Sequence, residues 1–418
     1  MSSSLCVFWW GYAMGVFAAS AMAGDWPAFR GPSGNGIAPN EHAPLRWGPG
    51  TNVVWKVALP GPGNSSPIVS RGRVFITCAE EQGRKRSLYC FERRTGSKLW
   101  ERTVEYSARE PTHLSNPYCA STPVTDGSNV VVWHGSAGVF CYDSNGTKRW
   151  EKQLGPIRHD WGYASSPLVH QGKVLLHFGP GAQTFLVALA LEGGAVLWKH
   201  DEPGGLDATD KRMVGSWTTP IIVRHNGREQ VLCSMPTRVL SCDPATGLLN
   251  WWCEGLGTER VELVYASPLI SGDICVAFSG WGNGPTFGFK LGGSGNLTTN
   301  RLWLEKQTQR IGSGVAVDGH AYIVNAGPGT AQCLECATGK TCWTERLDGG
   351  ESWGSLVLAA DCFYVTSRKG VTSVFRASPD KFELLAMNDL REPSNATPAI
   401  SDGQLFLRTD VHLFCVGE

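Results

Sequence analysis

The chain has 418 residues, and its 37 lysine and arginine residues balance its 37 aspartate and glutamate residues. This zero formal net charge gives no electrostatic basis for binding nucleic acid or anionic lipid, and 42% hydrophobic against 18% charged residues excludes a disordered chain. The 51 glycines and 17 tryptophans favour many tight turns and large aromatic side chains over long helices.

The first segment of the chain predicts export. Residues 6–23 are apolar and uncharged, and they end in Ala21-Met22-Ala23, which is typical of a signal-peptidase site. We therefore expect a signal peptide over 1–23 and a periplasmic or other extracytoplasmic mature chain. Because the first five residues contain no lysine or arginine, an uncleaved membrane anchor stays open. No other stretch is apolar enough to span a bilayer, and we expect a monomer.

An extended segment over 24–50 is expected to precede a single domain over 51–418 that is built from repeats. The sequence Ser65-Ser66-Pro67-Ile68 returns with variations along the chain. Two degenerate copies contain glycine or leucine in place of the proline. The equivalent positions are Pro67, Pro123, Pro167, Pro220, Pro268, Gly314, Leu356 and Pro398. These positions are 42 to 56 residues apart, and such spacings indicate one supersecondary unit per repeat, so eight units are predicted.

A second marker lies some 30 residues further on in most units. It is a tight turn followed by a tryptophan, as in Thr95-Gly96-Ser-Lys-Leu-Trp100, and it recurs before Trp150, Trp198, Trp251 and Trp343, with Trp303 in a longer copy. Between the markers lie short β-branched and aromatic runs, which are typical of strands. Each unit is thus a four-stranded antiparallel blade. In the seventh unit Leu384 or Leu385 is expected at the tryptophan position, so that blade should be the loosest.

The last unit predicts how the domain closes. It ends after three strands, and a strand containing the missing tryptophan is found at 52–59, around Trp55. Stacked blades expose sheet faces at both ends unless they close radially. We therefore expect an all-β, eight-bladed β-propeller that is closed by its N-terminal strand.

The 14 cysteines are interpreted as structural. Cys90, Cys141 and Cys333 fall at one repeat position, which Ala190 and Ser241 occupy in other units, so cysteine behaves there as a small buried side chain. The cluster Cys333, Cys336 and Cys342 has no second CxxC and no paired histidine nearby, so no metal site is expected. Disulfide pairing stays open.

The segment Cys242-Asp243-Pro-Ala-Thr246-Gly247-Leu-Leu-Asn-Trp251 resembles the tryptophan-docking repeat of the pyrroloquinoline-quinone-like eight-bladed propellers. This resemblance covers about 53–418. The opening Asp25-Trp26-Pro-Ala-Phe29-Arg30-Gly31 also resembles the lead-in of exported bacterial proteins of this class. The class implies either a quinoprotein dehydrogenase or a non-catalytic scaffold. In build, the chain is similar to the propeller lipoprotein of the outer-membrane β-barrel assembly machinery, although it carries no lipoprotein signal.

One face of the predicted propeller carries the long loops, and ligand sites tend to lie on such loops. These loops are 101–118, 152–163, 199–216, 252–264 and 344–352. A planar anionic cofactor such as a quinone would need stacking aromatics and cations. The candidate cofactor-binding residues on this face are Trp217, Tyr265, Trp281, Asn283, Arg310, Trp353 and Arg368. The alternative is that the aromatics only wedge adjacent blades apart.

Three functions remain candidates for this chain. Quinoprotein dehydrogenases hold the cofactor against a disulfide of adjacent cysteines and beside a calcium ion, but the chain has no Cys-Cys dipeptide. Neither calcium ligands nor a catalytic residue can be assigned. The leading expectation is therefore a non-catalytic binding or assembly scaffold with a protein partner or a small ligand on the long-loop face. The alternatives are a pyrroloquinoline-quinone-dependent dehydrogenase, with calcium, acting on alcohols or sugars, and a carbohydrate-binding propeller.

Overall fold

The structure is a computed structural model that describes residues 24–181, 183–202, 213–258, 261–280, 284–306 and 311–417. The expected signal segment, 1–23, lies outside these residues. Over the described ranges the only helices are three 3-10 turns, η1 (Glu81–Gly83), η2 (Gly135–Ala137) and η3 (Thr298–Asn300), and none of them could cross a membrane.

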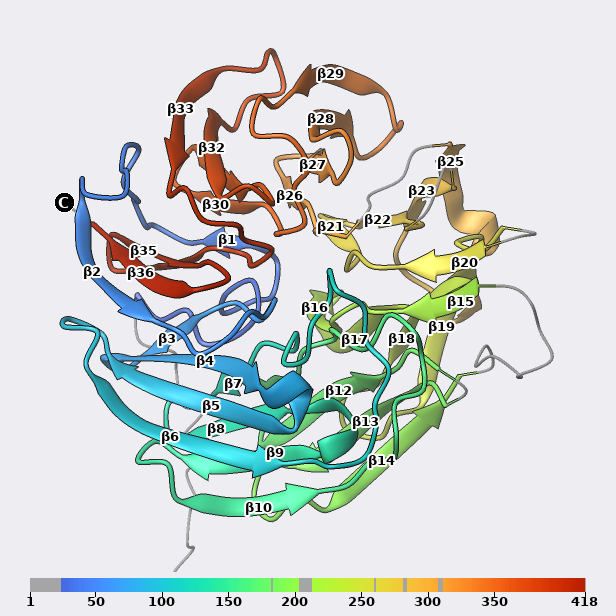
Figure 1. The fold of residues 1–418 in the computed structure, drawn as a ribbon. Coiled ribbons are helices and arrows are strands. Elements are labelled where there is room, and N and C mark those ends of the chain that lie inside the picture. The colour runs from blue at the N-terminus through green and yellow to red at the C-terminus, as the bar shows by residue number, and fades with distance from the viewer. Residues whose placement is uncertain are drawn as a thin grey trace, which may run out of the picture.

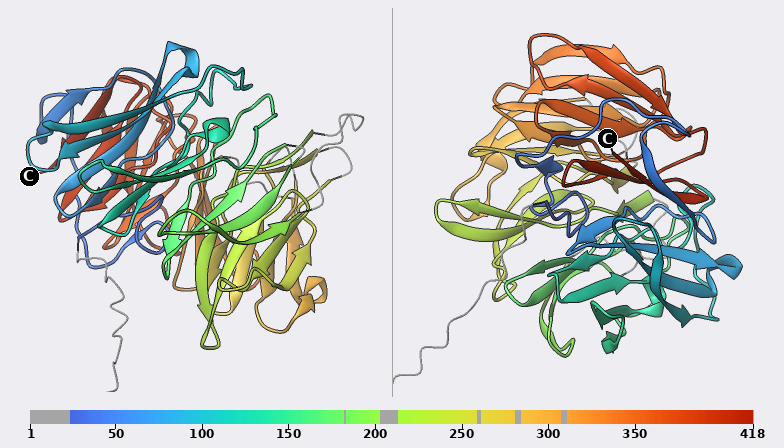
Figure 2. Two further views of the ribbon diagram at one scale, coloured as in Figure 1. Left: turned by 90° about the horizontal axis from the view of Figure 1, so that it is seen from below. Right: turned by 90° about the vertical axis from the view of Figure 1, so that its left-hand side faces the viewer.

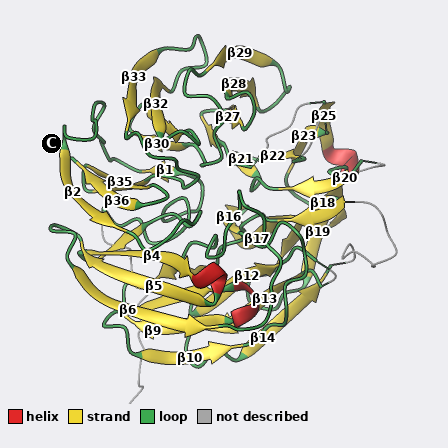
Figure 3. Ribbon diagram, in the orientation of Figure 1, coloured by secondary structure: helices red, strands yellow, loops and turns green. Residues whose placement is uncertain are grey.

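The strands form eight antiparallel sheets around a central axis, as the sequence predicted (Figures 1 and 3). The first four blades consist of β3 (Ile68–Ser70), β4 (Arg73–Glu80), β5 (Lys85–Glu92) and β6 (Lys98–Glu105); β7 (Val124–Thr125), β8 (Asn129–Trp133), β9 (Val139–Asp143) and β10 (Lys148–Lys152); β11 (Leu168–His170), β12 (Lys173–Phe178), β13 (Phe185–Ala190) and β14 (Val196–Asp201); and β16 (Ile221–His225), β17 (Arg228–Ser234), β18 (Arg238–Cys242) and β19 (Leu249–Glu254).

The other four blades consist of β21 (Leu269–Ser271), β22 (Ile274–Phe278), β23 (Thr286–Lys290) and β25 (Arg301–Glu305); β26 (Val315–Val317), β27 (His320–Asn325), β28 (Thr330–Glu335) and β29 (Thr341–Arg346); β30 (Val357–Ala359), β31 (Cys362–Thr366), β32 (Val371–Arg376) and β33 (Leu384–Asp389); and β34 (Ala399–Ser401), β35 (Gln404–Arg408), β36 (His412–Val416) and β2 (Val53–Ala58). The side views show these sheets packed face to face around the ring (Figure 2).

Three further strand pairings are parallel and join parts of different repeats. β1 (Ile37–Ala38) pairs with β30, β15 (Met213–Ser216) with β20 (Val261–Val264), and β24 (Gly295–Asn296) with β19.

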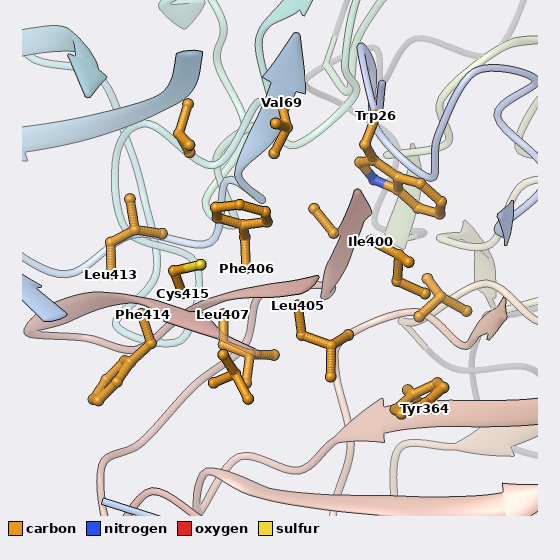
Figure 4. Close-up of a cluster of buried hydrophobic side chains, with 14 of the residues drawn as sticks. Trp26, Val69, Tyr364, Ile400, Leu405, Phe406, Leu407, Leu413, Phe414 and Cys415 are labelled. Carbon is orange, nitrogen blue, oxygen red and sulfur yellow. The ribbon is translucent and has the colours of Figure 1, made fainter. Parts of the chain in front are cut away.

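The N-terminal strand closes the ring. β2 lies antiparallel to β36, with Trp55 opposite Cys415, so the last blade takes its outermost strand from the start of the domain. Trp26, from the preceding segment, is buried in the same hydrophobic cluster as Val69 of the first blade and Ile400 of the last (Figure 4). The expected closure around Trp55 is confirmed, and Trp26 packs across the junction between these two blades.

The outer-strand tryptophans connect neighbouring blades. The indole N–H groups of six of them donate to a backbone carbonyl of the next blade at 2.7–3.2 Å: Trp55 to Arg93, Trp100 to Ser144, Trp150 to Leu191, Trp198 to Pro244, Trp303 to Cys336 and Trp343 to Ser378. Trp251 instead donates to Gln230 Oε1 within its own blade. The repeated tryptophan is therefore mainly a contact between blades.

In five blades the turn glycine accommodates the tryptophan of the preceding blade; these glycines are Gly96, Gly146, Gly194, Gly247 and Gly339. Gly247 has a φ of +73°, and a Cβ atom on it would lie 2.5 Å from the Trp198 ring. Glycine alone meets both demands, a left-handed backbone and close approach of an indole.

Two register assignments made from the sequence are wrong. In the outer strand of the first blade a β-bulge precedes the tryptophan: Trp100 lies opposite Cys90, and Lys98, two residues earlier, lies opposite Phe91. The outer strands of the other blades have the same bulge. By the same register Ala386, not Leu384 or Leu385, takes the tryptophan position of the seventh blade, opposite Val374. Trp47, from the N-terminal segment, belongs to the same buried cluster as Ala386 and stacks on Tyr364.

The second wrong assignment concerns the position shared by the cysteines. Ala188, not Ala190, lies opposite Trp198 and so matches Cys90. The described cysteines are all unpaired, and of these only Cys342 is exposed.

Candidate functional site: a central funnel

Hydroxyl groups from the repeats form a ring around the axis. In every repeat the residue before the proline position (the position of Pro67 in the first repeat) is serine or threonine. In seven of the eight repeats its backbone N–H donates to the hydroxyl oxygen of the equivalent residue in the next blade. These seven bonds, at 2.8–3.0 Å, join Ser66 to Thr122, Thr122 to Ser166, Ser166 to Thr219, Ser267 to Ser313, Ser313 to Ser355, Ser355 to Thr397, and Thr397 back to Ser66. At the eighth junction the Ser267 hydroxyl donates to the Thr219 carbonyl at 2.7 Å.

The segment before β2 covers one end of the channel inside this ring. The Pro27 carbonyl accepts a hydrogen bond from Thr125 N of the second blade, and the Arg30 guanidinium donates to the Gly314 carbonyl of the sixth. These blades lie on opposite sides of an eight-membered ring, so the chain between them crosses the axis, and Phe29 lines the central cavity. The channel is therefore a funnel, closed on the side of the short turns.

The funnel is a cavity of about 420 Å³. Among the described residues it is lined by Phe29, Asn64, His113, Ser115, Asn116, Ala120, Thr122, Trp161, Ala164, Ser166, Trp217, Thr219, Tyr265, Ile311, Ser313, Trp353, Ser355, Asn395 and Thr397. This size is typical of small-molecule sites. Phe29 is its floor, six members of the hydroxyl ring form its wall, and residues of the long-loop face form its rim.

Aromatic rings are packed against one another along part of the rim. The Trp161 and Tyr265 rings are stacked at 6.4 Å with an interplanar angle of 27°, and Trp217 lies 5.1 Å from Tyr265. His159 contacts Trp217 edge-on at 4.9 Å, and the Trp217 indole donates to the Gly162 carbonyl at 3.0 Å. These contacts fix the orientation of the aromatic surface that faces the funnel.

Amide side chains hold the rim loops and contribute polar groups to the funnel. Asn64 donates to the Ser115 carbonyl at 2.9 Å and to Asn116 Oδ1 at 3.1 Å, and Asn116 donates to the Trp161 carbonyl at 2.7 Å. Asn395 is different, because its Oδ1 atom is buried and has no partner within the described part of the chain. It therefore leaves one hydrogen-bond acceptor for a ligand.

A buried ion pair anchors the rim loop that contains His113 and Asn116. Arg86 Nη1 lies 3.0 Å from Glu110 Oε1, with side chains 1% and 0% exposed, and the other Glu110 oxygen accepts a hydrogen bond from Ser136 N at 2.5 Å. Burial opposes the charge on Arg86, but Tyr163, Glu110 and Cys119 raise the pKa of Arg86 above its usual value. The pair thus fixes the loop over the second blade.

The structure places the seven candidate residues as follows. Trp217, Tyr265 and Trp353 line the funnel together. Arg368 lies outside the lining, 4.5 Å from the centre of the Trp353 ring, and forms a 2.9 Å ion pair with Glu351. Trp281, Asn283 and Arg310 lie outside the described residues. Sequence reasoning missed Phe29, Asn395 and the hydroxyl ring, although a serine or threonine before each marker position was visible.

The described lining does not fit an anionic quinone with calcium. It contains no aspartate, glutamate, lysine or arginine, and Arg368, the candidate cation that lies among the described residues, is already paired with Glu351. No group of three or more histidine, cysteine, aspartate or glutamate residues capable of holding a metal occurs in the ranges that the structure describes. An anion placed here would lose its hydration without gaining a counter-charge.

Comparisons with known proteins agree on the fold. The sequence matches the family model described as "Outer membrane protein assembly factor BamB" over residues 49–115 and 84–345. No curated protein sequence matches the chain.

Similar solved structures include BamB from Moraxella catarrhalis, at 15% identity, 88% coverage of this chain, 97% of that chain and a TM-score of 0.59. The quinohemoprotein alcohol dehydrogenase of Comamonas testosteroni is 12% identical, with 96% and 82% coverage and a TM-score of 0.70. The quinohemoprotein alcohol dehydrogenase ADHIIG of Pseudomonas putida HK5 is 12% identical, with 95% and 80% coverage and a TM-score of 0.64. At such identities the likeness shows the fold alone.

Proposed function

The chain belongs to the family described as outer membrane protein assembly factor BamB, and from that premise we propose that it is an exported, non-catalytic propeller that binds its partner or ligand on the long-loop face. The observation that carries this proposal is the absence of charged side chains from the described lining of the funnel. Catalysis by a quinone would need cations for the cofactor's carboxylates and oxygen ligands for its calcium.

The long-loop face has further features that support a binding role. Leu114 is 99% exposed, and its neighbours His113 and Ser115 both line the funnel. A fully exposed leucine beside an aromatic rim gives a partner an apolar contact at the mouth of the funnel.

A dehydrogenase is the second candidate, because the aromatic rings of Trp161, Trp217 and Tyr265 around the funnel are suited to stacking on a planar cofactor. Dye reduction separates the two candidates. The purified protein, incubated with pyrroloquinoline quinone and calcium, is assayed over a panel of alcohols and sugars. The proposal predicts no reduction above a heat-inactivated sample. Turnover that requires the quinone and is lost in Trp217→Ala would establish the dehydrogenase instead.

Export is part of the proposal, supported by the apolar segment 6–23 and by a family description that names an outer-membrane factor. Intact-mass measurement of protein from the periplasmic fraction tests it, and an N-terminus at Gly24 is expected. A chain that keeps residues 1–23 in the membrane fraction would identify an anchor.

A further inference from the structure

The funnel wall presents hydrogen-bond donors that have no acceptor among the described residues. A hydroxyl group has one O–H donor and two acceptor lone pairs. Thr122, Ser166, Thr219, Ser313, Ser355 and Thr397 all line the funnel, and each accepts a backbone N–H from a neighbouring blade. Within the described residues none of these six hydroxyls donates its own hydrogen. The ring therefore offers O–H groups around the axis without any formal charge.

The rest of the lining adds an acceptor and apolar faces. Asn395 contributes a buried Oδ1 atom without a partner, and Trp161, Trp217 and Tyr265 contribute aromatic rings at the rim. Aromatic faces are electron-rich and attract weakly positive C–H groups. A ligand that matches this lining carries many hydroxyl or ether oxygens, has a face of C–H bonds and is uncharged.

The closed end of the funnel limits the shape of this ligand. Phe29 lies on the segment that crosses the axis between the second and sixth blades, so a chain cannot thread through the channel. The funnel can accept the end of a chain, whereas a ring-shaped molecule has no end to insert.

We propose that the funnel binds the terminal units of a neutral oligosaccharide. A sugar ring packs against the aromatic rim, and the sugar's oxygen atoms and hydroxyl groups form hydrogen bonds with the hydroxyl ring and Asn395. This inference rests on the proposed non-catalytic binding function and names the ligand class of the same site. Sugars with a carboxylate or an ammonium group are excluded, because the described lining offers neither charge a partner.

Calorimetric titration of the full mature chain tests the proposal, with maltotriose, cellotriose and N,N′,N″-triacetylchitotriose as the neutral probes. We expect one of them to bind with one-to-one stoichiometry. Its uronic-acid counterpart, and α-cyclodextrin in the case of maltotriose, should bind at least tenfold more weakly. Absence of binding for all three probes at millimolar concentration would overturn the proposal, as would equal affinity for the charged counterpart.

Variants locate the site. Trp161→Ala and Asn395→Ala should each weaken binding roughly tenfold, which corresponds to about 1.4 kcal/mol. Trp252→Ala is the matched control, because Trp252 is a similarly half-buried tryptophan on the outer strand β19, away from the funnel. Unchanged affinity in both funnel variants, or an equal loss in the control, would contradict the assignment.

The result is separable from that of the dye assay. Saccharide binding together with quinone-dependent turnover would reject the non-catalytic function while keeping the saccharide site. No saccharide binding and no turnover would reject the saccharide site and leave the proposed function standing.

Discussion

At the scale of single residues, two histidines at the ends of β8 and β12, in the second and third blades, are fully buried. Burial lowers the pKa of His134 to about 3 and that of His177 to about 4, both from 6.5. His177 Nδ1 lies 3.1 Å from the Thr218 carbonyl and donates to it in the neutral tautomer. Both side chains are therefore neutral in the folded protein at pH 7.

These histidines predict that acid destabilises the protein. The pKa of each histidine is lower in the folded protein than its unfolded value of 6.5. The neutral histidines therefore contribute folding stability that is fully present above pH 6.5 and is lost as the pH falls towards 4. His177 alone accounts for roughly 3 kcal/mol of that loss, at about 1.4 kcal/mol per pKa unit. Urea unfolding at pH 7, 6, 5 and 4 measures it. His177→Gln should flatten the dependence, whereas the exposed-site control His42→Gln should not. If the free energy of unfolding of His177→Gln depended on pH as steeply as that of the unaltered protein, His177 would not be a source of the acid sensitivity.

The buried pair under the rim loop gives a second prediction at this scale. Glu110→Gln leaves the Arg86 charge buried without its counter-ion, which costs about 3–5 kcal/mol. The control is Glu151→Gln, which breaks an exposed pair with Lys148 and should change stability by less than about 1 kcal/mol. Urea unfolding of both variants at pH 7 compares them. Equal losses would show that burial does not govern the Arg86–Glu110 pair.

At the scale of the blade, the contact between a turn glycine and the preceding tryptophan joins neighbouring sheets. In the fourth blade, Gly247→Ala places a Cβ against Trp198, whereas Gly227→Ala meets nothing within 4 Å although its φ is also positive, at +77°. The control should cost only the left-handed backbone penalty of about 1–2 kcal/mol. Gly247→Ala should cost at least about 1 kcal/mol more, because an indole must move. Equal melting temperatures for the two variants would show that the indole contact contributes nothing.

The blades themselves could be predicted because their markers repeat. Residues of the same type recur at the positions of Pro67 and Trp100 in most of the eight repeats. This recurrence identifies the repeats and therefore the fold. The β-bulge was not visible in the sequence, because an extra residue in a strand changes no residue type. Ala386 was missed for that reason: a search for a large side chain finds Leu384 or Leu385 instead. The expectation that the seventh blade is the loosest stays a prediction, and hydrogen exchange of its amides would test it.

At the scale of the whole molecule, the funnel depends on parts of the chain that no local pattern joins. Trp217, Tyr265 and Trp353 could be placed on the long-loop face from the repeat alone. The path of Phe29 across the axis could not, because segment 24–36 follows contacts with several blades instead of a periodic pattern of its own. Arg30 illustrates this: its guanidinium is buried, bonds the carbonyls of Asn35 and Gly314, and has its pKa lowered by burial to about 9.

The described lining of the funnel contains no aspartate, glutamate, lysine or arginine, so the funnel should select uncharged ligands. Calorimetric titration of the purified protein with pyrroloquinoline quinone, in the presence of calcium and at low ionic strength, is the direct measurement of this selectivity. An anion gains no counter-charge from the described lining, so no saturable binding below millimolar concentration is predicted. One-to-one binding at micromolar concentration or tighter, lost in Trp217→Ala, would contradict it.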